Sequence, residues 1–265
     1  MIERILFGCH NLTAGSSSAR SRGLVDTAFS LGIRRFDVAP SYGLGTAEAM
    51  LARALGARRH SVEITSKFGI LPAPLGVAAA WAREPYRALR RLWPKAQGPW
   101  PSVPAPLVPR EVPAPPVFPF SASTAVLRSL RRLGVDHLDA VLIHERIEGP
   151  FALGLGDELA ELKRRGLIKR WGVSGARSNV QDMIGLIGTP DIVQVASDDA
   201  ESFEWAPELR LFNLRHRASG ASAREVAELL AARARALFTA HPKAAVLFNT
   251  SSVAHLELFV KALLG

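Results

Sequence analysis

Short runs of apolar and β-branched residues alternate along most of the chain with longer stretches rich in alanine and leucine. The first kind of run is typical of buried strands, and the second is typical of helices. The pattern predicts eight strands, at Ile5–His10, Arg35–Ala39, Val62–Phe68, Leu138–His144, Lys169–Ser174, Ile192–Ala196, Leu209–Leu214 and Ala245–Thr250. It predicts helices between most of them, at Ala19–Leu31, Thr46–Leu55, Thr124–Leu133, Asp157–Arg165, Val180–Ile187, Ser222–Phe238 and Val253–Leu263.

Strands that alternate with helices indicate an α/β fold, and eight such repeats favour a closed (β/α)8 TIM barrel. We expect residues 1–265 to form this barrel as a single domain. A doubly wound open sheet is the alternative, but no GxGxxG motif follows the first strand, as its dinucleotide-binding form would require. Only Ser197–Glu208 separate the sixth and seventh strands, so the sixth helix of the barrel is expected to be reduced or lost.

The segment Ile70–Phe120 interrupts this alternation after the third strand. It holds 13 of the 18 prolines, and they exclude regular structure over most of its second half. It also carries Trp81, Trp93 and Trp100. We therefore expect a long insertion that packs in part over the carboxyl ends of the strands as a lid, with a flexible surface excursion as the alternative.

The composition, with 48% hydrophobic and 22% charged residues, is ordinary for a soluble globular protein. The first residues lack a secretory leader and no apolar stretch reaches the length of a membrane span, so a cytoplasmic protein is expected. A lone cysteine, Cys9, excludes an intramolecular disulfide and a cysteine metal cluster, and no metal site is expected. Nothing in the composition indicates an oligomeric state.

The formal net charge of +9 raises the question of nucleic acid. The arginines, however, are scattered among alanines and leucines, as in Arg224–Arg235, and no platform of aromatic and basic residues stands out. An anionic small molecule such as a dinucleotide explains the sign of the charge equally well, so nucleic acid is not favoured.

Four side chains capable of proton chemistry fall at or just after predicted strand ends. They are Asp37, Tyr42, Lys67 and His144. The carboxyl ends of barrel strands converge on one mouth, so these four groups are expected to meet there. Each alone has an ordinary explanation, such as a helix cap, loop packing or a solvated charge, and the order of the four along the chain is what favours a site.

These residue types suit proton transfer at an oxygen atom. A phenol donates a proton poorly at neutral pH, and a neighbouring ammonium is expected to lower its pKa. A carboxylate such as Asp37 would hold Lys67 in place and keep it charged, while His144 would orient the substrate oxygen. Such a set fits proton transfer to a carbonyl oxygen, or from an alcohol, while a hydride moves at carbon.

The stretch Gly32–Gly43, with Asp37 and Tyr42, resembles the signature of the aldo-keto reductases, and Lys67 and His144 match the rest of that family's catalytic tetrad. The resemblance spans most of the chain. The insertion and the lead-in Phe120–Asp139 are most similar to the sugar- and pyridoxal-dehydrogenase branch. The resemblance implies an NAD(P)-dependent oxidoreductase that interconverts a carbonyl (aldehyde, ketone or lactone) and an alcohol or lactol, with Tyr42 as the general acid and base.

The resemblance also implies a set of residues that bind the cofactor. Ser174 and Gln194 match residues that hold the nicotinamide amide, although Gly175 stands where the family has an asparagine. Phe212 is a candidate for the ring that stacks on the nicotinamide. The stretch Phe248–Leu256 resembles the family's last phosphate-binding loop, with Asn249, Thr250, Ser251 and His255 as candidates.

Two departures from the family pattern leave the function open. Asn249 and His255 stand where many members carry a lysine and an arginine, so the usual preference for NADP is not expected and NAD is plausible. The altered cofactor loop and the shortened sixth repeat also admit a catalytically silent barrel that binds a ligand or a partner protein. The complete tetrad favours the enzyme.

Overall fold

The computed structural model describes residues 1–14, 18–72, 121–145, 147, 152–214 and 221–265. Most of the predicted insertion, residues 73–120, lies outside the described residues, and so does the expected lid. The barrel itself is described almost throughout, and it carries all the candidate site residues.

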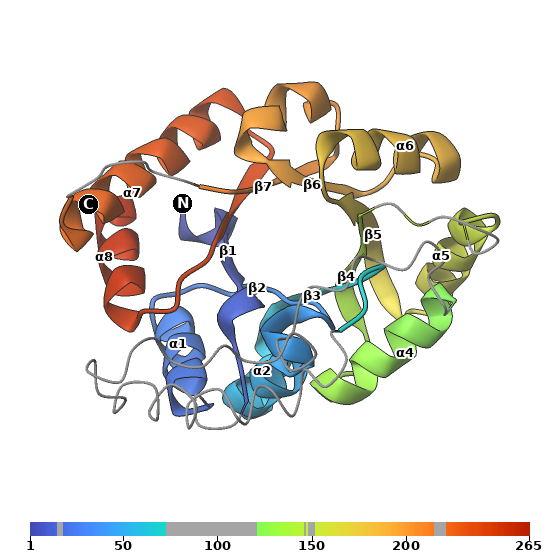
Figure 1. The fold of residues 1–265 in the computed structure, drawn as a ribbon, viewed down its shortest axis with the longest axis horizontal. Coiled ribbons are helices and arrows are strands. Elements are labelled where there is room, and N and C mark those ends of the chain that lie inside the picture. The colour runs from blue at the N-terminus through green and yellow to red at the C-terminus, as the bar shows by residue number, and fades with distance from the viewer. Residues whose placement is uncertain (15–17, 73–120, 146, 148–151, 215–220) are drawn as a thin grey trace, which may run out of the picture.

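Eight parallel strands form a closed barrel in which each strand pairs with its neighbours in sequence and β8 pairs with β1 (Figure 1). This order confirms the predicted (β/α)8 TIM barrel and excludes the doubly wound open sheet. The strands are β1 (Ile5–Gly8), β2 (Arg35–Asp37), β3 (Glu63–Phe68), β4 (Leu138–His144), β5 (Ile168–Ser174), β6 (Ile192–Ala196), β7 (Glu208–Phe212) and β8 (Ala244–Phe248).

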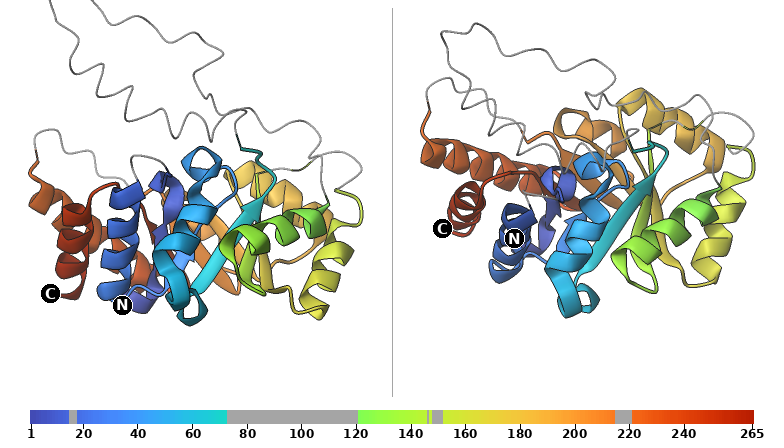
Figure 2. Two further views of the ribbon diagram at one scale, coloured as in Figure 1. Left: turned by 90° about the horizontal axis from the view of Figure 1, so that it is seen from below. Right: turned by 60° about the horizontal axis from the view of Figure 1, so that its bottom comes forward.

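Helices surround the ring of strands and run alongside it (Figures 1 and 2). They are α1 (Ser18–Ser30), α2 (Ala47–Leu55), α4 (Ala122–Leu133), α5 (Leu155–Arg164), α6 (Arg177–Ile187), α7 (Ala223–Ala240) and α8 (Val253–Leu264). Where the sixth helix of the barrel would stand, after β6, there is only a 3-10 segment, Ser197–Phe203. The reduction of this helix is therefore confirmed, because the short connection has no room for an α-helix and its loops.

Some strands are shorter than predicted at their carboxyl ends. β1 ends at Gly8, and Cys9–Asn11 form a 3-10 turn. β2 ends at Asp37 and β8 at Phe248. After β1 and β2 the apolar character continues with Cys9 and with Val38 and Ala39, so hydrophobicity alone overestimates these two strands, whereas the polar residues Asn249 and Thr250 follow β8. The residues just beyond these ends are free to turn toward the mouth of the barrel.

Side chains alternate between the two faces of each strand, as in any sheet. Residues such as Phe7, Phe36 and Val193 face outward and join the large core beneath the helices. Residues of the opposite parity fill the barrel, where Leu6, Ala245 and Leu247 form one apolar cluster. A second inner cluster comprises Ala140, Leu142 and Ile192. Apolar side chains of the two clusters thus fill part of the barrel interior beneath its carboxyl-terminal mouth.

The amino-terminal end of the barrel is closed by charged side chains. Glu63 forms ion pairs with Arg35 at 3.0 Å, with Arg170 at 2.9 Å and with Arg210 at 2.8 Å. Glu208 pairs with the same three arginines, at 2.8 Å for Arg210. Burial by itself raises the pKa of Glu208, but Arg210 and Arg35 outweigh it and lower the pKa to about 2. The network joins β2, β3, β5 and β7 across the interior.

Candidate functional site

The predicted site residues lie at the carboxyl ends of neighbouring strands, on the face that points into the barrel. Asp37 ends β2, Lys67 is the penultimate residue of β3, and His144 ends β4. Ser174 ends β5, and Gln194 lies in β6 directly beside it in the register of the sheet. The alternation of side chains therefore brings all five to one mouth, as the sequence predicts.

Asp37 and Lys67 form a fully buried ion pair at this mouth. The Lys67 ammonium donates to the Asp37 carboxylate, and both side chains are 0% exposed. Burial alone would lower the pKa of Lys67, but the charge of Asp37 and the contact with Tyr42 reverse this and raise the pKa. Lys67 is therefore a fixed positive charge beneath the site, as its pairing with a carboxylate predicts.

Tyr42 lies in a short 3-10 segment, Tyr42–Gly45, that follows β2. The Lys67 Nζ is 4.8 Å from the centroid of its ring, and the centroid of the His144 ring is 5.9 Å away at an interplanar angle of 88°. These distances bring Asp37, Tyr42, Lys67 and His144 together in one cluster. The expected meeting of the four groups is thus present in the structure.

The pKa of Tyr42 differs in direction from the sequence-based expectation. Burial is the largest influence and raises the pKa above 10.0; Lys67 lowers it, and Asp37 raises it again. The ammonium acts with the expected sign, but burial outweighs it, and the Asp37 carboxylate opposes it as well. The net shift is therefore upward, and the group at the mouth at neutral pH is the phenol.

His144 is neutral over the whole physiological range of pH. Burial, followed by the charges of Lys67 and His10, lowers its pKa to about 3. A neutral imidazole has one N–H donor and one acceptor nitrogen, so it offers a substrate oxygen a hydrogen bond without adding charge.

His10 is a neighbour of Tyr42 that the sequence analysis missed. Its ring centroid lies 5.0 Å from that of Tyr42 at an interplanar angle of 73°. The Tyr42 ring thus makes T-shaped contacts with two imidazole rings, those of His10 and His144. The sequence predicts a first strand that includes His10, and a strand gives no reason to expect this contact. In the structure His10 lies in the 3-10 turn that follows Gly8, and from there its ring reaches Tyr42.

Gln194 has a hydrogen-bonding group that nothing in the described chain satisfies. The residue is 2% exposed, yet its Oε1 has no partner among the described residues. A buried acceptor of this kind needs a donor to offset the loss of water. The amide N–H group of a nicotinamide is such a donor, and Ser174 lies beside Gln194, so the residues present fit this part of the cofactor.

Gly175, which stands where the family has an asparagine, is covered by a carboxylate. A Cβ atom at this position would lie 2.6 Å from Glu145 Oε2 and 2.8 Å from its Cδ. Glu145 directly follows His144, and the sequence analysis did not single it out. The exchange of asparagine for glycine thus makes room for an acidic side chain from the neighbouring strand end.

The remaining candidates lie around β7 and β8. Phe212 ends β7 and packs against Leu6 and Leu247 inside the barrel. Asn249 follows β8 and extends over β1, where a Cβ on Gly8 would lie 1.8 Å from Asn249 Oδ1. Only glycine at position 8 leaves the Asn249 side chain in this place.

The chain after Asn249 enters helix α8 through a capped turn. The Thr250 hydroxyl accepts from the Ser252 amide at 3.1 Å, and Ser252 caps the helix by accepting from the His255 amide at 3.4 Å. Ser251 and His255 are exposed beside this turn. The candidates of the last loop are thus grouped at the amino terminus of a helix, where anions are commonly bound.

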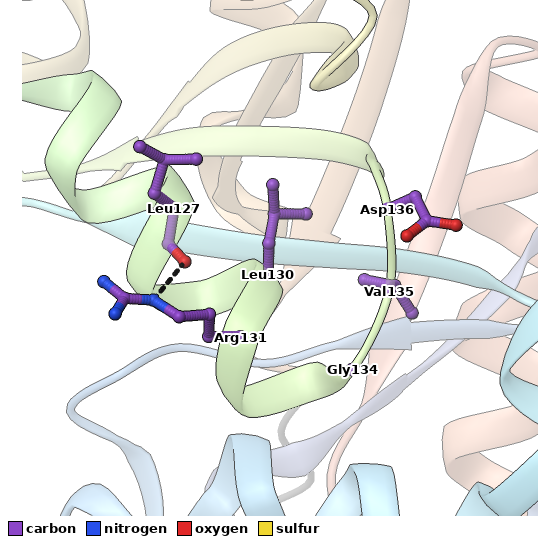
Figure 3. A pocket seen from close by; sticks show the side chains of 6 residues that line it. All are labelled: Leu127, Leu130, Arg131, Gly134, Val135 and Asp136. Carbon is purple, nitrogen blue, oxygen red and sulfur yellow. Dashed lines mark hydrogen bonds between the residues drawn. The ribbon is translucent and has the colours of Figure 1, made fainter.

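A shallow hollow of about 400 Å³ lies elsewhere, on the outside of the barrel at the end of α4 (Figure 3). It is lined by Leu127, Leu130, Arg131, Gly134, Val135 and Asp136. None of these residues belongs to the predicted site.

The described ranges contain no group of three or more histidine, cysteine, aspartate or glutamate side chains suited to a metal ion. They also contain no helix with the length and hydrophobicity to cross a bilayer.

Known proteins resemble this chain in sequence and in fold. Residues 4–204 match the model of the aldo/keto reductase family. An uncharacterized oxidoreductase of Bacillus subtilis, YqkF, is 26% identical over 180 residues, which cover 68% of this chain and 47% of that protein. The match thus spans about half the length of that relative.

Two solved structures share the fold. An aldo-keto reductase from Bacillus halodurans is 18% identical with a TM-score of 0.67, and the alignment covers 99% of this chain and 87% of that one. An aldo-keto reductase from Klebsiella pneumoniae in complex with NADPH is 18% identical with a TM-score of 0.63, covering 98% of this chain and 85% of that one. At these identities the likeness establishes the barrel.

Proposed function

The chain belongs to the aldo/keto reductase family, and on this basis we propose that it is an NAD(P)-dependent oxidoreductase with Tyr42 as its proton-transfer residue. The observation that carries the proposal is the cluster at the mouth, in which Tyr42 contacts both the charged Lys67 and the neutral His144. The substrate class is a carbonyl compound, namely an aldehyde, ketone or lactone, or the corresponding alcohol or lactol.

The residues of this chain carry out the proton transfer that accompanies the movement of the hydride. Tyr42 donates its proton to the substrate oxygen as the carbonyl carbon is reduced, and it accepts that proton back in the oxidative direction. Lys67, held by Asp37, stabilises the phenolate that remains after donation. His144, being neutral, directs an N–H toward the same oxygen and sets its position. Solvent then returns a proton to Tyr42.

A nicotinamide dinucleotide supplies the hydride when it is bound. Gln194 would accept a hydrogen bond from the nicotinamide amide through its unpartnered Oε1, with Ser174 beside it. Phe212 would contact the ring. Thr250, Ser251, Asn249 and His255 would hold the phosphates near the amino terminus of α8, where backbone amides favour anions.

The experiment that tests the proposal has two arms. The tryptophan fluorescence of the protein is first titrated with NADH and NADPH, and quenching is expected for at least one of them. The protein is then incubated with the oxidised cofactor and a panel of lactols and secondary alcohols, and the absorbance of the reduced cofactor is followed. Binding without turnover on any member, or on the matching aldehydes and ketones, would favour a silent barrel. Absence of binding would contradict the proposal.

A further inference from the structure

Glu145 holds an unusual backbone conformation directly beside the proposed site. Its φ is 66°, in the left-handed region that side chains other than glycine, asparagine and aspartate seldom adopt. Its amide still donates to the Ser174 carbonyl at 2.7 Å, so it continues the pairing of β4 with β5 by one residue. A left-handed conformation of this kind costs free energy and is commonly found where a side chain serves a function.

The carboxylate of Glu145 is held in one place by two neutral donors. Its Oε2 accepts from Asn179 Nδ2 at 2.6 Å and more weakly from the Ala176 amide at 3.4 Å, both at the start of α6. It lies against the backbone of Gly175, in space that any Cβ at that position would occupy. Because neither donor carries a charge, they fix the position of the negative charge without neutralising it.

This carboxylate lies against Gly175, the residue that follows Ser174 of the subsite assigned above to the nicotinamide. The Gly175 amide that it covers donates to the Gln194 carbonyl at 3.2 Å. Gln194 provides the unpartnered acceptor, and Ser174 lies between His144, the residue before Glu145, and Gln194 in the register of the strands. The carboxylate, the buried amide and the hydroxyl are therefore carried on adjacent strand ends.

We propose that Glu145 selects the oxidised form of the nicotinamide cofactor and so favours oxidation of the substrate alcohol or lactol. The inference rests on the proposed function. The nicotinamide ring carries a positive charge when oxidised and none when reduced, so a fixed carboxylate nearby stabilises only the oxidised form. In the favoured direction the alcohol loses a hydride to the cofactor and its hydroxyl proton to Tyr42, which yields the carbonyl and the reduced cofactor.

The test compares the dissociation constants of NAD⁺ and NADH in the full-length protein. NADH is titrated by quenching of tryptophan fluorescence, and NAD⁺ by its competition with NADH. Glu145→Gln keeps the length of the side chain and an acceptor for Asn179 but removes the charge. We expect it to weaken NAD⁺ relative to NADH by roughly tenfold, the size of a charge–charge interaction over several ångströms at an intermediate dielectric constant.

Two further variants make the result decisive. Glu145→Gly also removes the charge and suits the left-handed backbone, so it should fold even if the glutamine variant does not. Glu161→Gln removes one negative charge from the exposed carboxyl-terminal half of α5, where Glu161 pairs with Arg164, and should leave the ratio unchanged. The same two titrations of the wild type and the three variants are made with NADP⁺ and NADPH if the wild type binds only that pair.

An unchanged ratio in both Glu145 variants would overturn the inference while leaving the proposed function intact. An equal shift in Glu161→Gln would also overturn it, because the effect would then belong to net charge. If the wild type binds neither cofactor pair, the proposed function fails, and the inference fails with it. A selective shift of the ratio in the Glu145 variants supports the inference.

Discussion

The ammonium of Lys67 lies 4.8 Å from the centre of the Tyr42 ring, and its own charge is paired with the buried carboxylate of Asp37. This arrangement places a cation beside the phenol without making the phenol acidic. Burial and Asp37 raise the pKa of Tyr42, and Lys67 only moderates the rise. Lys67 therefore stabilises the phenolate formed during the reaction, while the resting group remains protonated.

We predict that kcat/KM for carbonyl reduction is nearly independent of pH from about pH 5 to about pH 9. Tyr42 must be protonated to donate, and its pKa is raised above 10.0, so activity falls only on the alkaline side of that value. His144 stays neutral across the same range because its pKa is lowered to about 3. The measurement is a pH–rate profile with the cofactor saturating. A loss of activity as the pH rises from 6 to 8 would contradict the raised pKa of Tyr42, and a loss as the pH falls from 8 to 6 would contradict the lowered pKa of His144.

We predict that Tyr42→Phe reduces turnover by about 10²–10⁴-fold, the usual size of a proton-transfer contribution. The phenylalanine ring keeps the contacts with His10 and His144, so the dissociation constant of NADH should change little. Steady-state kinetics with a substrate from the panel and a fluorescence titration of NADH measure the two quantities. Near-normal turnover in a folded variant would remove Tyr42 from the mechanism.

We predict that the protein prefers NADH or discriminates weakly between NADH and NADPH. Asn249 and His255 occupy the last loop, and neither side chain is the fixed cation that recognises a phosphate group best. Parallel titrations give the ratio of the two dissociation constants. NADPH binding about a hundredfold tighter than NADH, a difference of about 2.7 kcal/mol, would show that the positive charge comes from another part of the chain.

We predict that Glu208→Gln destabilises the barrel at pH 7 by about 3 kcal/mol. The pKa of Glu208 is lowered from 4.5 to about 2 in the folded state, so its ionised form stabilises the fold above pH 4.5, and this contribution disappears as the pH falls from there toward 2. Wild type and variant should therefore converge in acid. Urea denaturation at pH 7 and at about pH 3 measures the difference.

A matched control exists on the surface. Glu228 pairs with Arg224 one helical turn away on α7, and both side chains are exposed. Glu228→Gln should change the free energy of unfolding by less than about 1 kcal/mol, because water screens such a pair. Equal effects of the two substitutions would mean that the network of Glu63, Glu208 and the three arginines adds nothing beyond an ordinary surface contact.

The sequence by itself determined the alternation of strands and helices and the residues at the strand ends. The strands can be recognised locally, because a parallel strand is buried on both faces and is therefore uniformly apolar. The residues at their ends can be grouped, because the carboxyl ends of all strands in such a barrel lie at one mouth. Lys67 and His144 were therefore predictable as partners, although 77 positions of chain separate them. The missing sixth helix was predictable from the length of its connection alone.

Only the tertiary structure decided what surrounds these groups. The direction of the pKa of Tyr42 depends on how much water the assembled mouth excludes and on how completely Asp37 balances Lys67. The contacts of His10 with Tyr42 and of Glu145 with Gly175 arise where the chain leaves β1 and β4, at turns that hydrophobic periodicity does not encode. The burial of a side chain and the charges near it depend on residues that are distant in sequence. The pKa values of the groups at the mouth are therefore set only when the barrel has closed.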